Sequence, residues 1–306
     1  MPLAKPRDEP SGRAADFFGK LYGGFKTIHR QMQALGESKN GKQQAAKRPS
    51  QRVRKFIGWR RQFYVEQEHL EKEALRDWRF LIFNPYHHGH LLTRRIGGVS
   101  QALDMFLRSG DEAFLKEALV HARHSTAVSL AFRKLFDGSA KPKNVDLPQL
   151  LTQVGESFSQ SHFDHAAMRV HKPRAKLVAM IDPELAYLAF YNLFRNAVNA
   201  AEENPRIAVS FSRRNGSNVV TITDNGSGLG EYHSRILSMP LDELFAENAS
   251  SIRRKKIPCA GIGILSTRRI VEDAGGKLII KKTGPSGTAF EVELPAGKQT
   301  TAKRAP

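Results

Sequence analysis

The stretch Asp224-Asn225-Gly226-Ser227-Gly228 decides how this chain is interpreted, because it directly follows the alternating segment Asn218-Val219-Val220-Thr221-Ile222-Thr223. Such alternation predicts a β-strand. A carboxylate at the end of a strand, beside glycines without side-chain bulk, can accept a hydrogen bond from an adenine amino group while the base lies against the backbone. The stretch therefore predicts a nucleotide pocket, and a plain turn between strands is the alternative.

A helix is predicted upstream of this strand from apolar residues at three- and four-residue steps, namely Leu185, Leu188, Ala189, Leu193, Ala197 and Val198. Asn192 and Asn196 lie one turn apart on one face of that helix. Two amides in this arrangement could hold a metal ion and phosphate oxygens together. Amides on the surface of a helix, without any ligand, are the alternative.

Downstream, Gly261-Ile262-Gly263-Ile264-Leu265-Ser266 predicts a glycine turn that leads into an amphipathic helix ending at Gly275-Gly276. Free backbone N–H groups and the helix dipole at such a junction favour phosphate, although a lone Gly-x-Gly is by default a plain loop. Lys277–Ile280 and Thr288–Pro295, separated by a turn at 284–287, predict a closing hairpin. The charged stretch 231–260 predicts a lid or a solvated loop.

Taken in order, the asparagine helix, Asp-x-Gly-x-Gly, Gly-x-Gly and the Gly-Thr-x-Phe strand resemble the ATP-binding domain of sensor histidine kinases. That domain belongs to the superfamily shared with gyrase B, Hsp90 and MutL. The resemblance runs from near Asn144 to Leu294 and implies an α/β sandwich that binds ATP and Mg²⁺ beneath a mobile lid. By matching position it implies Mg²⁺ on Asn196, phosphates near Asn192 and the adenine amino group on Asp224. It further implies that Gly226 and Gly228 lie beside the base, that Gly261 and Gly263 flank the lid and the phosphates, and that Thr288 supports the adenine through a water.

The residue at position 192 bears on the choice between kinase and hydrolase. The hydrolysing members of the superfamily resemble one another in placing a glutamate, the general base that activates water, one turn before the metal-binding asparagine. Asn192 occupies that position here, and an amide cannot take up a proton at neutral pH. The site is therefore better suited to holding ATP for transfer than to hydrolysing it.

A helical hairpin is predicted before the nucleotide domain. Apolar residues from Leu75 to Phe106 recur at alternating three- and four-residue steps, a turn follows at Ser109-Gly110-Asp111, and a second helix runs from Phe114 to Asp137-Gly138. Two such helices bury both apolar seams most economically as a dimeric four-helix bundle. This hairpin resembles the dimerisation and phosphotransfer domain of histidine kinases.

The phosphoacceptor of that domain is sought in Tyr86-His87-His88-Gly89-His90-Leu91-Leu92-Thr93. When Leu91-Leu92-Thr93 is aligned with the apolar-apolar-Thr sequence of the family, the acceptor position falls on Tyr86. A small shift of that alignment places His87 or His88 there instead. None of the three histidines is followed by Asp or Glu, so the carboxylate expected to take the imidazole proton is missing. His87 and His88 are the candidate acceptors, and a chain with no acceptor is the alternative.

The histidines also allow a metal interpretation, since helix pairing could bring His87, His88 and His90 close to His121 and His124. Supporting thiol or carboxylate ligands are absent from the pattern, and the chain has one cysteine. That single cysteine excludes an internal disulfide and suits a reducing cytoplasm. No apolar run reaches the length of a membrane span.

The charge is unevenly distributed. Of the net +18, residues 1–61 carry +11, from 15 Lys or Arg against four acids. Their composition predicts a mostly disordered leader that could contact nucleic acid or an anionic surface weakly, or serve as a solvated linker.

The sequence thus predicts an α+β protein: a basic leader over 1–65, a dimerisation and phosphotransfer hairpin over 66–140, an α/β-sandwich ATP domain over 141–297 and a tail over 298–306. The expected function is that of a cytoplasmic, homodimeric histidine kinase that uses ATP and Mg²⁺ to phosphorylate a bundle histidine. The phosphoryl group would then pass to an aspartate of a response-regulator receiver domain. A non-catalytic ATP-binding scaffold or phosphotransfer relative is the first alternative, and a nucleic-acid-binding ATPase is the second.

Overall fold

A computed structural model of the chain describes residues 98–99, 101–159, 166–171, 173, 175–201, 203–230, 235, 237–240, 243 and 262–297, together with positions 19, 22, 23 and 26. His87, His88, His90 and Gly261 lie outside these residues, as does nearly all of the leader. The chain divides into two compact units, Met1–Ser139 with Phe245–Cys259 and Ala140–Leu244 with Ala260–Pro306. Among the described residues, no helix combines the length and apolar character that crossing a bilayer requires.

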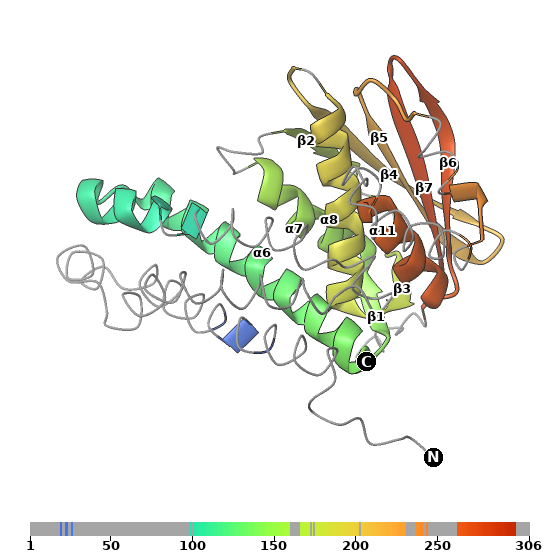
Figure 1. The fold of residues 1–306 in the computed structure, drawn as a ribbon, viewed down its shortest axis with the longest axis horizontal. Helices are drawn as coiled ribbons and strands as arrows, with labels where there is room; N and C mark the ends of the chain where they lie inside the picture. The colour runs from blue at the N-terminus through green and yellow to red at the C-terminus, as the bar shows by residue number, and fades with distance from the viewer. Residues whose placement is uncertain are drawn as a thin grey trace, which may run out of the picture. The chain divides into compact units, whose positions relative to one another are not determined.

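The described part of the first unit is dominated by the helix α6 (Glu112–Asp137), which confirms the predicted second helix (Figure 1). Asp111 caps its N-terminus by accepting a hydrogen bond from the backbone N–H of Ala113 at 2.8 Å. Gly138 ends it in the left-handed conformation, with φ of 65°. Residues 101–109 before the turn are also helical. Both ends of α6 therefore lie where capping chemistry in the sequence indicates.

The buried face of α6 is partly polar. His121 and His124 are 1% and 0% exposed, and the Nε2 atom of His121 lies 3.5 Å from Oε1 of Glu117 one turn earlier. A Cβ atom on Gly98 would lie 2.9 Å from the His121 ring, so the preceding helical segment packs closely there. Within the described residues no group of three or more His, Cys, Asp or Glu side chains could hold a metal ion.

The second unit is an α/β sandwich. Its five-stranded sheet has the order β2-β4-β5-β7-β6, with β2 (Ala167–Val170) parallel to β4 (Arg206–Arg214). The strands β5 (Ser217–Asp224), β6 (Lys277–Gly284) and β7 (Gly287–Pro295) continue it in antiparallel pairs. A small second sheet pairs β1 (Lys143–Asp146) with β3 (Val178–Ile181). The predicted strand before Asp224 and the closing hairpin are therefore confirmed.

Three helices, α7 (Leu147–Ser159), α8 (Pro183–Ala200) and α11 (Ile262–Asp273), form a layer on one face of the sheet (Figure 1). Alternate strand residues face this layer and are buried, for example Ile222 opposite Phe290 and Val220 opposite Val292. On α7 and α8, the rings of Phe158 and Tyr191 lie 5.0 Å apart between centroids. The core thus lies between the sheet and the helices, with α8 against β4 and β5 and α11 against β6 and β7.

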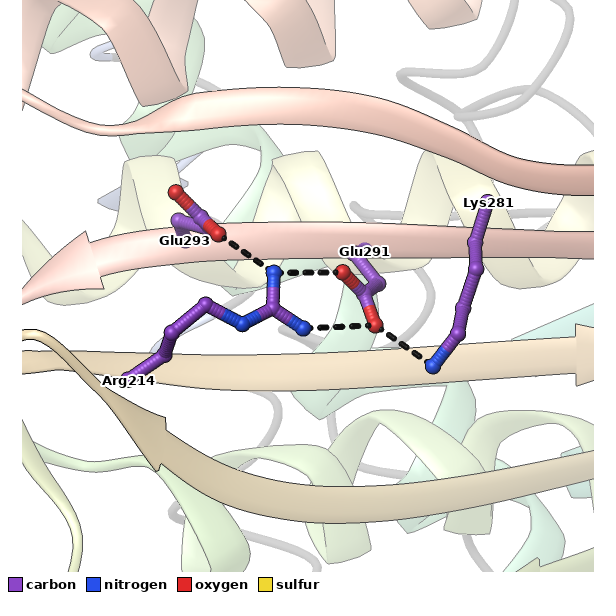
Figure 2. A network of polar contacts seen from close by, with 4 residues as sticks. All are labelled: Arg214, Lys281, Glu291 and Glu293. Atoms are coloured by element: carbon purple, nitrogen blue, oxygen red, sulfur yellow. Dashed lines mark hydrogen bonds and ion pairs between the residues drawn. The ribbon is translucent and has the colours of Figure 1, made fainter.

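The opposite face of the sheet carries a network of charged side chains (Figure 2). Arg214 on β4 contacts both carboxylate oxygens of Glu291 at 3.0 and 3.3 Å and reaches Glu293 at 2.9 Å, while Lys281 lies 2.8 Å from Glu291. Hydrogen bonds from Lys281 and then from Arg214 hold the pKa of Glu291 below its usual value. Because the partners come from β4, β6 and β7, the network joins three strands across this face.

Candidate nucleotide-binding site

The helix α8 begins at a capping site and presents both asparagines from the same face. Oδ1 of Asp182 accepts hydrogen bonds from the backbone N–H groups of Glu184 and Leu185 at 3.1 and 3.3 Å, and Pro183 occupies the first turn. Asn192 lies further along and is 3% exposed, and Asn196 is partly exposed one turn later. Helical periodicity therefore brings the two amides together, as expected from their spacing.

The two amides have unused hydrogen-bonding capacity. Within the described part of the chain, the Nδ2 atoms of Asn192 and Asn196 are buried and have no hydrogen-bond partner. A buried donor without a partner costs about 1–3 kcal/mol, so such groups in a folded protein commonly have a role beyond stability. Two of them on adjacent turns are consistent with donors that await a ligand.

The helix α11 packs against this face of α8. The hydroxyl of Thr267 donates to the carbonyl oxygen of Ala189 on α8 at 3.1 Å or to that of Gly263 at 2.8 Å. A Cβ atom on Gly263 would lie 3.6 Å from Cβ of Asn192 and from both amide atoms of Asn196. Gly263 thus adds no side chain to the space beside the amides.

The predicted glycine turn before this helix is wrong in one respect. Residues 261–266 were expected to form a turn, but α11 already begins at Ile262, which places Gly263 within its first turn. Packing of α11 on α8 outweighs the low helix propensity of glycine at this position. The backbone N–H groups of the first turn have no intrahelical partners, so the anion-favouring end of the helix lies at Gly263 itself.

Asp224 is the last residue of β5, and described residues hydrogen-bond to only one of its two carboxylate oxygens. Oδ1 accepts hydrogen bonds from the backbone N–H groups of Gly226 at 2.9 Å and Thr288 at 3.0 Å. No described residue hydrogen-bonds to Oδ2. One oxygen therefore fixes the carboxylate plane, and the other remains available as an acceptor from a partly exposed position.

The glycines around Asp224 are required by close approach. A Cβ atom on Gly226 would lie 2.6 Å from Cβ of Ala200, the last residue of α8, and the backbone N–H of Ser227 donates to the carbonyl oxygen of Ala200 at 3.0 Å. Gly228 has φ of 87°, and a Cβ there would lie 2.5 Å from the carbonyl oxygen of Gly284. The Asp-x-Gly-x-Gly turn is thus pressed between the end of α8 and the β6–β7 hairpin.

Thr288 completes the described site. It is 3% exposed, and its hydroxyl lies 3.4 Å from that of Thr283 on β6. The Thr283 hydroxyl in turn accepts a hydrogen bond from the backbone N–H of Leu229 at 2.7 Å. Sequence patterns did not indicate Thr283 or Ala200 as parts of the site, because neither belongs to a recognisable motif.

The predicted lid is described only in part. Residues 235, 237–240 and 243 of the stretch 231–260 are described. Nη1 of Arg268 on α11 donates to the carbonyl oxygen of Met239 at 2.5 Å, and Nε of the same side chain contacts Glu272 at 2.7 Å. The beginning of the predicted lid is therefore attached to α11.

The residues present suit Mg²⁺ and ATP. Amide and carboxylate oxygens are the ligands that Mg²⁺ prefers, and Asn196 supplies an amide oxygen next to Gly263, which has no side chain. The unpartnered amide donors match phosphate oxygens, and Oδ2 of Asp224 matches an amino group. The two asparagines lie on α8, and the glycine turn that follows β5 is hydrogen-bonded to Ala200 at the end of the same helix. One ligand could therefore be held at both of its ends.

Residues 181–298 match the family described as Histidine kinase-, DNA gyrase B-, and HSP90-like ATPase. The chain is 23% identical over 242 residues to the sensor protein KdpD of Clostridium acetobutylicum, covering 76% of this chain and 25% of that protein. It is 25% identical over 164 residues to the virulence sensor protein BvgS of Bordetella bronchiseptica, covering 53% and 11%. The chain thus spans about a quarter or less of the length of these curated relatives.

Solved structures of similar proteins include the catalytic domain of histidine kinase ThkA, at 20% identity and a TM-score of 0.41, covering 51% of this chain and 95% of that one. A mycobacterial sensor histidine kinase, MprB, matches at 18% identity and a TM-score of 0.39, covering 52% and 99%.

Proposed function

On the premise that residues 181–298 form a domain of the Histidine kinase-, DNA gyrase B-, and HSP90-like ATPase family, related to sensor kinases, we propose that the chain is an ATP-dependent protein histidine kinase of two-component signalling. The observation that carries the proposal is the pair of buried Nδ2 atoms of Asn192 and Asn196 beside Gly263, neither of which has a hydrogen-bond partner among the described residues. They lie on the helix whose last residue abuts the Asp224 turn.

Each side chain has a distinct role in the proposed site. Oδ1 of Asn196 binds Mg²⁺, and the amide of Asn192 donates to a phosphate oxygen. Oδ2 of Asp224 accepts from the adenine amino group, while Oδ1 keeps the carboxylate in place. Gly226 and Gly228 leave room for the base, and Thr288 supports it through a water. Mg²⁺ held there would neutralise negative charge on the phosphate oxygens.

The same residues disfavour hydrolysis. A water molecule attacks the γ-phosphate efficiently when a carboxylate removes its proton, and Asn192 cannot do so. The site therefore holds ATP until another nucleophile reaches it. With an imidazole nitrogen as nucleophile, a phosphorus–nitrogen bond forms, the bond from the γ-phosphorus to the bridging oxygen breaks, and ADP leaves.

We further propose His87 or His88 as the acceptor, on a hairpin that pairs with that of a second copy to form a four-helix bundle. A response-regulator receiver domain then takes the phosphoryl group on an aspartate. These steps rest on the sequence and on the family relationship. The same support underlies four further proposals: a cytoplasmic location, domain limits at 65, 140 and 297, a contribution of Gly261 to the site, and weak contacts of residues 1–61 with nucleic acid or an anionic surface.

Phosphorylation with γ-labelled ATP tests this proposal. Wild-type protein with Mg²⁺ should acquire a label that is labile in acid and stable in base, and His87→Gln or His88→Gln should remove it. His29→Gln in the leader is the matched control and should keep the label. Absence of label from wild type that demonstrably binds ATP would reject the kinase.

A second candidate is a non-catalytic relative that binds ATP as a scaffold or phosphotransfer protein. It is favoured by the absence of an acidic residue directly after His87, His88 or His90. It predicts calorimetric binding of Mg²⁺ and ATP with no phosphohistidine, and a label lost specifically in one histidine variant would exclude it.

A further inference from the structure

We propose that Thr283 is a positioning residue of the nucleotide site, an inference that rests on the ATP binding proposed above. Its hydroxyl oxygen accepts a hydrogen bond from the backbone N–H of Leu229 at 2.7 Å. Leu229 directly follows the Asp-x-Gly-x-Gly turn, and Thr283 lies near the end of β6. The side chain therefore joins the turn beside the expected base to the closing hairpin.

Three backbone N–H groups at the turn are hydrogen-bonded, each to a different element, and the side chain of Asn225 makes further hydrogen bonds to the backbone of Arg206 and Asn204. The backbone N–H of Gly226 binds the side chain of Asp224 on β5, that of Ser227 binds the carbonyl oxygen of Ala200 on α8, and that of Leu229 binds Thr283 on β6. The first two bonds hold the start of the turn. Among the contacts of the described residues, the Thr283 bond fixes its end, beyond Gly228.

The position of that end matters because Gly228 is tightly confined. The space for a Cβ on Gly228 is filled by backbone atoms of Gly284, the residue after Thr283. The turn therefore lies against the hairpin at the point where the Thr283 hydroxyl holds it. Release of Leu229 would let Gly228 move away from Gly284, which would displace the backbone against which the base is expected to lie.

Thr283 also lies opposite Thr288 in the pairing of β6 with β7, with their hydroxyl oxygens 3.4 Å apart. The backbone N–H of Thr288 donates to Oδ1 of Asp224. Because Leu229 supplies the donor in its bond to Thr283, the hydroxyl hydrogen of Thr283 remains free to point towards Thr288. Thr283 thus contacts both the residue after the turn and Thr288, which holds the carboxylate of Asp224. It does not itself accept the hydrogen bond from the adenine.

The substitution Thr283→Val removes the hydroxyl and retains a β-branched side chain suited to a strand. Loss of this one hydrogen bond, which lies at an exposed position, should weaken nucleotide binding about three- to tenfold. The loss should be equal for ATP and ADP, because the bond lies at the base end of the ligand. Thr283→Ser keeps the hydroxyl and should restore wild-type affinity.

Calorimetric titration of the full chain with Mg²⁺ and either ATP or ADP, together with thermal unfolding, tests the inference. The control is Thr221→Val on β5, where the hydroxyl makes no hydrogen bond to any described residue. Equal affinity of Thr283→Val and wild type would overturn the inference while leaving ATP binding intact. The inference would also be overturned if Thr283→Ser failed to restore binding, or if Thr283→Val lost affinity for ATP alone. A similar loss of affinity in Thr221→Val, or an unfolding temperature of Thr283→Val lowered by more than about 5 °C, would overturn it as well. Wild type that binds neither nucleotide would overturn the proposed function itself.

Discussion

Replacement of Asp224 by asparagine should change which base the pocket accepts. In the structure, Oδ1 of Asp224 accepts from the backbone N–H groups of Gly226 and Thr288, and Oδ2 has no partner among the described residues. An asparagine keeps both backbone bonds when its amide oxygen takes the Oδ1 position. Its NH₂ group then occupies the Oδ2 position, so a donor replaces the acceptor that should face the adenine amino group.

The expected loss of ATP affinity follows from the hydrogen bond at Oδ2, and the expected loss of stability follows from the two hydrogen bonds at Oδ1. A hydrogen bond to a charged acceptor contributes about 1.5–3 kcal/mol, and partial exposure of Asp224 favours the lower end of this range. The affinity for ATP should therefore fall about tenfold or somewhat more, since about 1.4 kcal/mol corresponds to a factor of ten. Both backbone hydrogen bonds remain but lose charge assistance, so the free energy of unfolding should fall by only about 1 kcal/mol.

Inosine triphosphate sharpens this test, because it carries an acceptor oxygen where ATP carries the amino group. Wild type should prefer ATP in calorimetric titrations with Mg²⁺, and Asp224→Asn should bind inosine triphosphate at least as tightly as ATP. Asp273→Asn is a matched control, since Asp273 is 56% exposed and contacts Arg269 on the surface of α11. Unchanged ATP affinity in Asp224→Asn, or an unchanged preference between the two nucleotides, would refute the assignment of Oδ2 to the base.

Three other substitutions probe the packing, the charge network and the metal ligand. Gly226→Ala introduces a Cβ atom 2.6 Å from that of Ala200, so urea denaturation should show a loss of about 1–3 kcal/mol, and full stability would contradict the close approach. The pKa of Glu291 is lowered chiefly by its hydrogen bond from Lys281, so its contribution to stability is complete above the usual pKa and is lost as pH falls through the lower folded value. The unfolding midpoint of Glu291→Gln should accordingly depend less on pH below about pH 5 than that of wild type, and parallel curves would contradict this. Asn196→Ala should lower the affinity for ATP about tenfold with Mg²⁺ and much less in a chelator, whereas an equal loss in both would exclude Asn196 as the metal ligand.

Local sequence patterns predicted many of the helices and strands of the second unit. The helix with Asn192 and Asn196, the strand that ends at Asp224 and the hairpin of β6 and β7 are confirmed, as is the resemblance to the ATP domain of sensor histidine kinases. Each depends on residues close together in the chain: apolar periodicity, alternation along a strand or a glycine-containing turn. The start of α11 was misjudged because glycines at 261 and 263 indicate a turn locally, and contact with α8 outweighs that tendency.

The amino-acid sequence alone therefore determined the order of the elements and the polar residues available to a nucleotide. Only the tertiary structure decided that Ala200 contacts Gly226, that Thr283 holds Leu229 and that described residues hydrogen-bond to one oxygen of Asp224 and not to the other. These contacts join residues far apart in the chain, and they depend on the register of β5, β6 and β7 and on how α8 packs across the sheet. Sequence periodicity reports which face of an element is buried, but the partner at each contact is set by the packing of several elements at once.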